Sequence, residues 1–126
     1  MKPDFKPGNN IAMKVPAHEF AATVSFYRDV LGFNQKEALS SDSSQSVAFE
    51  FGDKNLWIDR TPGLSQAEIW LQVIARDSEQ ASDYLKTSGC VRCDEIEPLP
   101  DGYRGFWIAG PSNIIHLVSE AADFTD

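Results

Sequence analysis

The sequence repeats one order of helix, turn and strand signals at a spacing of 57 or 58 residues. Gly32 and Gly89, each at the end of an apolar helical pattern, are separated by 57 residues, and Gly52 and Gly110, each shortly before an Asn and an apolar run, by 58. Self-similarity at a fixed period is the signature of a repeated structural unit. Since a unit of this size cannot bury the face of its own sheet, we expect the two copies to share a core and form one domain.

The first copy is predicted over about residues 10–60. A strand is expected at residues 10–15, followed by a helix that begins near Pro16, a favourable first-turn residue, and ends at Gly32. Alternating and β-branched patterns then predict three strands, at residues 35–39, 47–51 and 55–60. Along the helix, apolar residues recur with the periodicity of one buried face, at Phe20, Val24, Tyr27 and Leu31.

The second copy is predicted over about residues 67–120, after a turn-rich linker at 61–66. Its first strand covers residues 68–73, and its helix is capped by Asp77, with Gln80 three residues later, and is stopped by Gly89. Three strands follow, at residues 91–97, 103–109 and 114–120. Each copy therefore has the order β-α-β-β-β, which predicts an α+β fold.

The charge of the chain bears on its partners. Nineteen acidic against eleven basic residues give a net charge of −8. Binding to nucleic acid is driven by clustered Lys and Arg, so we expect no nucleic-acid partner. There is no run of 18 or more apolar residues, and the first ten residues lack the apolar stretch of a signal peptide. We therefore expect no membrane partner and a cytoplasmic location.

The two cysteines, Cys90 and Cys93, form a C-x-x-C motif. A zinc site would need a second ligand pair, which the sequence does not supply. Thioredoxin-type chemistry places the first Cys at a helix N-terminus, whereas this pair follows the helix-ending Gly89 and enters a strand. We expect two reduced, unreactive thiols.

Three stretches resemble the vicinal-oxygen-chelate superfamily, which includes glyoxalases, extradiol dioxygenases and bleomycin-resistance proteins. They are "FYRDVLGF" at residues 26–33, the strand-helix unit at 68–89, and "FWIAGPSNIIHLV" at 106–118. The resemblance implies that each β-α-β-β-β copy is a curved sheet backed by its helix. It further implies that the two sheets form an incomplete barrel around a ligand cleft, and that the protein is a homodimer.

The alternation of side chains along a strand predicts which residues face that cleft. If Ile11 and Val15 pack on the first helix, the side chains between them face the cleft. The same rule places either Phe106 or Trp107 in the cleft without deciding between them. The predicted cleft residues are Asn10, Lys14, Glu68, Trp70, Gln72, His116 and Val118, and, through the repeat, Ile58 and Arg60.

In metal-dependent members of the superfamily, one ligand comes from each of four strand positions, which here hold Asn10, Ile58, Glu68 and His116. A catalytic divalent ion needs about three His or carboxylate ligands, and only His116 and Glu68 qualify. We therefore expect no metal cofactor. Three alternatives stay open: an ion held by His116, Glu68 and Asn10; a hydrogen-bonded pair of Glu68 and His116 that acts without an ion; or His116 as part of the cleft wall.

An aromatic cleft with a few polar groups is typical of a site for a small organic molecule, in particular a cationic or aromatic one. The leading hypothesis is a metal-free binding protein of the bleomycin-resistance type. The alternative is a glyoxalase-like metal-dependent lyase, or a related enzyme, that uses His116 and Glu68 as ligands or as an acid-base pair. A third hypothesis is a regulatory module whose cleft is filled by its own side chains.

Overall fold

The computed structural model describes residues 2–37, 39 and 42–121. The chain divides into two compact units. We call residues 9–70 the N-terminal unit, and residues 1–8 together with 71–126 the C-terminal unit. Within the described residues, no helix is long and apolar enough to cross a membrane.

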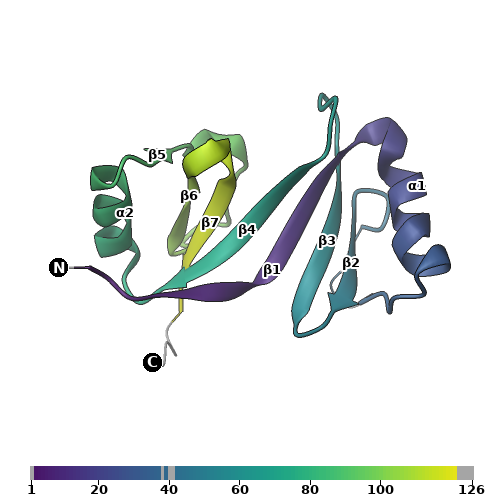
Figure 1. The fold of residues 1–126 in the computed structure, drawn as a ribbon, viewed down its shortest axis with the longest axis horizontal. Helices are drawn as coiled ribbons and strands as arrows, with labels where there is room; N and C mark the ends of the chain where they lie inside the picture. Colours follow the sequence, from purple (N-terminus) through teal and green to yellow (C-terminus); the bar gives the residue numbers. More distant parts are fainter. Residues whose placement is uncertain (1, 38, 40–41, 122–126) are drawn as a thin grey trace. The chain divides into compact units, whose positions relative to one another are not determined.

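The N-terminal unit contains three paired strands: β1 (Phe5–Pro16, of which residues 9–16 belong to this unit), β2 (Ser46–Phe51) and β3 (Lys54–Thr61). Their order is β2-β3-β1, with β2 and β3 antiparallel and β3 and β1 parallel (Figure 1). The helical segment between β1 and β2 comprises a 3-10 turn (Ala17–Glu19), α1 (Phe20–Ser25) and a π-helical turn (Phe26–Val30).

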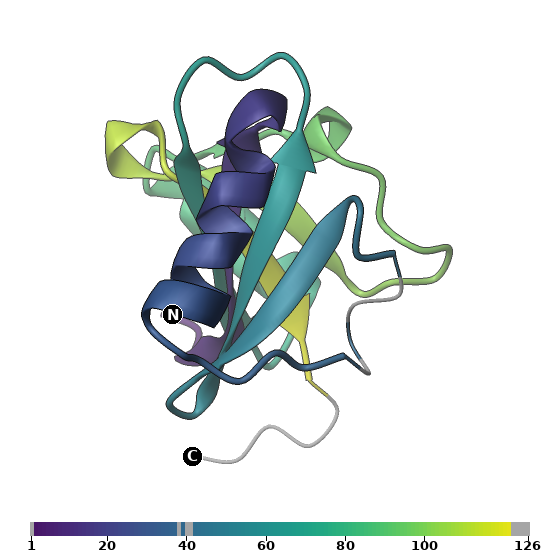
Figure 2. The same ribbon diagram turned by 90° about the vertical axis from the view of Figure 1, so that its right-hand side faces the viewer.

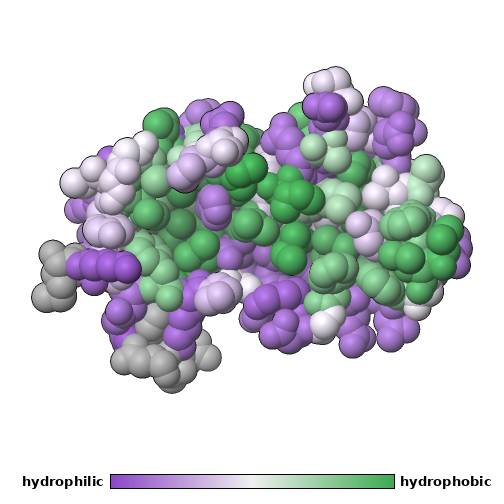
Figure 3. Space-filling view, viewed as in Figure 1, coloured by the Kyte–Doolittle hydropathy of each residue, from purple (hydrophilic) through white to green (hydrophobic). Residues whose placement is uncertain are grey.

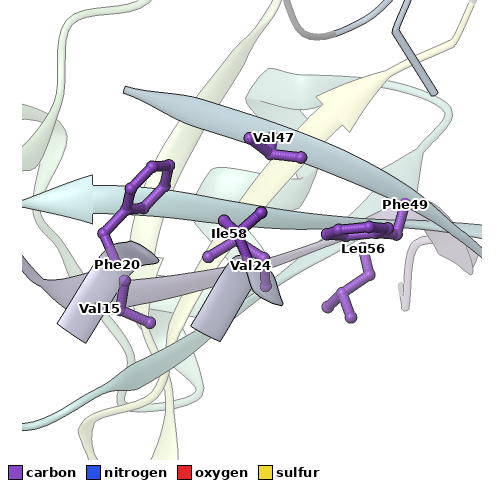
Figure 4. Packing of buried hydrophobic residues seen from close by; sticks show 7 residues of the cluster. All are labelled: Val15, Phe20, Val24, Val47, Phe49, Leu56 and Ile58. Atoms are coloured by element: carbon purple, nitrogen blue, oxygen red, sulfur yellow. The ribbon is translucent and has the colours of Figure 1, made fainter. Parts of the chain in front are cut away.

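The core of this unit lies between the helical segment and one face of its sheet. Phe20 and Val24 of α1 pack on alternate residues of the strands, and Figure 2 shows α1 lying across β3 and β2. Figure 4 shows the side chains of this cluster: Val15, Phe20, Val24, Val47, Phe49, Leu56 and Ile58. Because residues two apart on a strand share a face, this cluster fixes the orientation of all three strands.

The C-terminal unit contains β4 (Glu68–Ala75, of which residues 71–75 belong to this unit), β5 (Val91–Arg92), β6 (Gly105–Ala109) and β7 (Ile115–Glu120). The strand order is β4-β7-β6-β5, with β4 and β7 parallel and the other pairs antiparallel. α2 (Ser78–Thr87) follows β4, and short 3-10 turns cover Asp94–Ile96 and Pro111–Asn113. The core beneath α2 consists of Ala75, Ala81, Phe106, Ile108 and Val118.

Two carboxylates fix the start of α2. The Asp77 side chain accepts a hydrogen bond from the Gln80 backbone N–H at 3.0 Å, as the capping pattern predicts. Glu120, at the end of β7, accepts from the Ser78 N–H at 2.8 Å and from the Arg104 guanidinium. The hydrogen bonds from Arg104 and then from Ser78 lower the pKa of Glu120 to about 2. The helix is thereby tied to the end of its sheet.

The predicted α+β class is confirmed, and so are both predicted helices. Gly32 and Gly89 have φ values of 72° and 97°, which suit a glycine that ends a helix. Leu31, expected in the core, is 45% exposed because the π-helical turn rotates it away from the sheet.

Two predicted strands are shorter than expected. The strand predicted at 35–39 forms only an isolated bridge from Gln35 to Phe49, and part of the predicted range, residue 38, lies outside the described residues. The strand predicted at 91–97 ends at Arg92, because the Asp94–Ile96 turn follows it directly.

The central position of Ile58 in the N-terminal core gives a prediction. Ile58 is fully buried, so Ile58→Ala should lower the free energy of unfolding by about 2–5 kcal/mol, through lost apolar contact and the cavity left behind. Urea denaturation followed by circular dichroism measures this change. Arg60→Ala, two residues further along β3 at an exposed position, is the control and should change stability little. A loss below about 1 kcal/mol for Ile58→Ala would contradict the assigned packing.

Candidate functional site

The sheet face opposite α1 carries most of the polar side chains of the N-terminal unit. We call this face, which bears Asn10, Lys14, Trp57, Asp59 and Trp70, the polar face. The strand register places Lys14 directly beside Asp59 and Asp59 beside Ser46. The predicted orientation of Asn10 and Lys14, away from the helix, is confirmed by their partners on this face.

Lys14 is at the centre of the polar face and is only 5% exposed. Its Nζ lies 2.9 Å from Asp59 Oδ2, and Asp59 Oδ1 accepts a hydrogen bond from the Ser46 hydroxyl. A buried ammonium is stable only when it is paired, so Asp59 is the residue that allows Lys14 to remain charged inside the unit. The predicted alternative, in which Lys14 extends into solvent, does not occur.

Trp70 joins this ion pair to an exposed carboxylate. The Lys14 ammonium lies 4.2 Å from the centroid of the Trp70 ring, within the range of a cation-π contact. The Trp70 indole N–H donates to Glu68 Oε1 at 3.1 Å. Trp70 is 8% exposed, whereas Glu68 is exposed, so Glu68 presents a carboxylate to solvent at the edge of an aromatic surface.

A second polar group on the same face surrounds Asn10. Its side-chain oxygen accepts from the Asn55 amide at 3.0 Å and from the Trp57 indole N–H at 2.9 Å. Asn55 in turn accepts from Lys36 Nζ at 2.6 Å. Asn10 therefore orients Trp57 rather than offering its oxygen to an ion.

In the C-terminal unit, Gln72 lies on the sheet face opposite α2. Its amide donates to the Ser119 hydroxyl at 3.2 Å, and the Tyr103 hydroxyl lies 2.5 Å from the same oxygen. Trp107 shares this face, because it pairs with Leu117 while Phe106 pairs with Val118 in the core. Trp107 is 5% exposed, and its indole N–H donates to the Glu97 carbonyl oxygen at 3.0 Å.

The orientation predicted for Ile58 and Arg60 is wrong. Ile58 belongs to the core beneath α1, and its register partner Met13 also packs there. Arg60 shares the side of β3 that carries Ile58 and is exposed. Burial of Leu56 and Ile58 sets the direction of β3, so the intervening Trp57 and Asp59 lie on the polar face instead.

The orientation predicted for His116, Val118 and Phe106 is also wrong. Val118 and Phe106 are buried beneath α2. His116 lies on the same side of β7 and lines a pocket next to Leu85 of α2. Its Nδ1 is 3.0 Å from the Ile114 carbonyl oxygen. The role of these residues in ligand binding stays a prediction, but they do not belong to the face that carries Gln72.

The resemblance to metal-dependent members raises the question of whether this donor set fits a divalent ion. Among the described residues, no group of three or more His, Cys, Asp and Glu side chains comes together as a metal site. On the polar face, the Asp59 carboxylate is already engaged by the Lys14 ammonium, a cation that would oppose a metal ion beside it. These residues do not fit a resident metal, and we derive no reaction step through one.

The sequence analysis missed three members of the polar face, namely Trp57, Asp59 and Ser46. A signal for the first two was present: in the run from Asn55 to Asp59, Leu56 and Ile58 alternate with less apolar residues, which predicts that the aliphatic pair faces the core. The orientation had instead been transferred from His116 by the 58-residue repeat. Ser46 gave no comparable signal, since its place depends on the register of β2 with β3.

The cysteines behave as expected for unreactive thiols. Cys90 and Cys93 are free and partly buried. Burial, together with the nearby carboxylates of Glu95 and Asp94, raises the pKa of Cys93, which is the opposite of what a redox thiolate requires.

Comparison with known proteins yields similarity at the level of structure. No family model matches the sequence, and no curated protein matches it. Among solved structures, a Mn(II)-bound glyoxalase from Novosphingobium aromaticivorans matches 94% of this chain with a TM-score of 0.63 and 20% identity. Homoprotocatechuate 2,3-dioxygenase from Brevibacterium fuscum matches 98% with a TM-score of 0.61 and 19% identity. Hypothetical protein BH1468 from Bacillus halodurans C-125 matches 97% with a TM-score of 0.60 and 12% identity.

These similarities define the class of fold. Glyoxalases and homoprotocatechuate 2,3-dioxygenases belong to the vicinal-oxygen-chelate superfamily, so this chain has the fold of that superfamily, as the sequence motifs predicted. The chain spans 40% of the length of the glyoxalase and 34% of that of the dioxygenase, but 98% of the Bacillus protein.

The buried ion pair of the polar face can be tested by a double-mutant cycle. Asp59→Asn leaves the Lys14 ammonium buried without its carboxylate and should lower stability by about 3 kcal/mol. Adding Lys14→Met removes the unpaired charge, so the double variant should recover most of that loss. Denaturant unfolding of the four proteins measures both effects. Additive losses from the two substitutions would show that the pair is not coupled.

Proposed function

We propose that the polar face of the N-terminal unit binds a small organic cation with an aromatic or apolar group, without a metal ion and without changing the ligand chemically. The observation that carries this proposal is the exposed Glu68 carboxylate fixed at the edge of Trp70. Sequestration of this kind is the function of the bleomycin-resistance type that the sequence suggested.

The distribution of charge on this face supports a cationic ligand. Asp59 offsets the charge of Lys14, so the pair contributes little net charge to its surroundings. Glu68 hydrogen-bonds an uncharged indole and keeps its negative charge at the solvent boundary. An ammonium group could pair with Glu68 while an attached ring contacts the partly exposed Trp57. The net charge of −8 would favour the approach of such a ligand.

The second candidate is a metal-dependent lyase or a related enzyme that uses His116 and Glu68. Similarity to the Mn(II)-bound glyoxalase is the observation in its favour. Against it stand the orientation of His116 toward α2 and the absence of a three-ligand group among the described side chains. We therefore place it second, with a divalent ion as its cofactor.

We also propose a homodimer and a cytoplasmic location. Exposed apolar side chains gather over the C-terminal end of the α1 segment, on the right of Figure 3, as at many protein interfaces. They are Phe26, Val30, Leu31 and the nearby Phe51, and sedimentation velocity tests the pairing. The unpaired thiols of Cys90 and Cys93 are consistent with a reducing compartment.

The ligand proposal is tested with 2-phenylethylamine as the cationic probe and 2-phenylethanol as its neutral counterpart. The parent protein should bind the amine more tightly than the alcohol, and Glu68→Gln should weaken amine binding about tenfold, the effect of losing one charge-assisted hydrogen bond. Isothermal titration calorimetry measures the affinities. Asp83→Asn, which removes one exposed carboxylate from α2, is the matched control and should leave binding unchanged. Equal affinity for amine and alcohol would refute the proposal.

Elemental analysis separates the two candidate functions. Protein produced with ample Mn, Fe and Zn, and purified without a chelator, should carry far less than one divalent ion per chain. A stoichiometric ion that is lost in His116→Ala would instead establish the metal-dependent candidate.

A further inference from the structure

The C-terminal unit contains an apolar pocket between α2 and its sheet, on the side opposite Gln72. The pocket has a volume of about 240 Å³. It is lined by Phe5, Val73, Leu85, Cys90, Ile108, Gly110, Pro111, His116 and Val118, all of which belong to one unit. Among these side chains, the imidazole of His116 is the strongest hydrogen-bonding group.

The pocket exists because this copy of the repeat is filled less completely than the other. Val24 is buried beneath α1 in the N-terminal unit, and 57 residues later Ala81 holds the buried position on α2. Phe20, whose ring fills the first core, corresponds at the same spacing to the capping residue Asp77, which contributes no apolar group. The smaller helix side chains leave space that the strands of the C-terminal unit do not fill.

His116 replaces a core aliphatic residue. Ile58 is fully buried beneath α1, and the residue 58 positions later is His116, on the helix side of β7. The Ile114 carbonyl oxygen can only accept a hydrogen bond, so the contact of 3.0 Å requires a proton on Nδ1 of His116. In the neutral imidazole, Nε2 is then an acceptor. Gly110 gives the ring room, since a Cβ at that position would lie 3.4 Å from His116 Cε1.

We propose that this pocket is a second ligand site, for a small aromatic molecule with one hydrogen-bond donor, such as a phenol. A dry cavity of about 150 Å³ accepts a benzene ring, so the pocket has room for a ring with a substituent. The ring contacts Leu85, Ile108 and Val118, and its hydroxyl donates to Nε2 of His116. The site lies on the opposite side of the sheet from Gln72 and Ser119 and does not depend on the function proposed for Glu68.

Phenol is the probe, and toluene, of similar size but without a donor, is its matched control. The protein should bind phenol with a Kd of about 1 mM, as expected for a ligand of seven heavy atoms. Toluene should bind at least fivefold more weakly, and His116→Phe should abolish this preference. Methyl resonances of Ile108 and Val118, followed by NMR during the titration, report the affinity and the location together.

Two variants make the outcome decisive. Leu85→Trp fills the pocket and should abolish phenol binding while the affinity for 2-phenylethylamine stays unchanged; Val73→Phe serves the same purpose should the first variant unfold. Glu68→Gln should leave phenol binding intact, which separates this site from the one on the polar face. Equal affinities for phenol and toluene, or phenol-induced shifts outside the pocket residues, would overturn the proposal.

Discussion

The burial of Leu56 and Ile58 beneath α1 is the constraint on which the rest of the N-terminal unit depends. Since side chains alternate along a strand, these two residues oblige Trp57 and Asp59 to lie on the other face of β3. Parallel pairing with β1 then places Asp59 beside Lys14, where the carboxylate stabilises an ammonium that is almost wholly buried. An apolar contact on one face of the sheet thus creates the charged centre of the other.

The two copies of the repeat share an order of elements but use it differently. The N-terminal copy fills its helix side with large apolar residues and carries an ion pair and two indoles on its polar face. The C-terminal copy has alanines beneath α2, a pocket lined by His116, and a hydrogen-bonded group of Gln72, Ser119 and Tyr103 on the opposite face. Duplication therefore conserved the backbone arrangement while the side chains of the two halves diverged.

The sequence predicted the fold better than the site. Glycines with positive φ and the Asp77 cap are local signals, so both helices could be placed from the sequence. The face of β3 could have been read from Leu56 and Ile58, but transferring it from His116 assumed that both copies keep the same residue in the same role. The contacts of Lys14 with Asp59 and Trp70 join residues distant in sequence, and they follow only from strand register, which no local pattern specifies.

The orientation of β3 is tested most directly by nuclear Overhauser effects from the methyl groups of Ile58. The structure predicts strong effects to the protons of Phe20, Val24 and Val47, which pack around Ile58, and none to the indole protons of Trp70. Effects between the Ile58 methyl groups and the Trp70 ring would place Ile58 on the polar face. That result would contradict the arrangement from which the Lys14–Asp59 pair and the proposed ligand site follow.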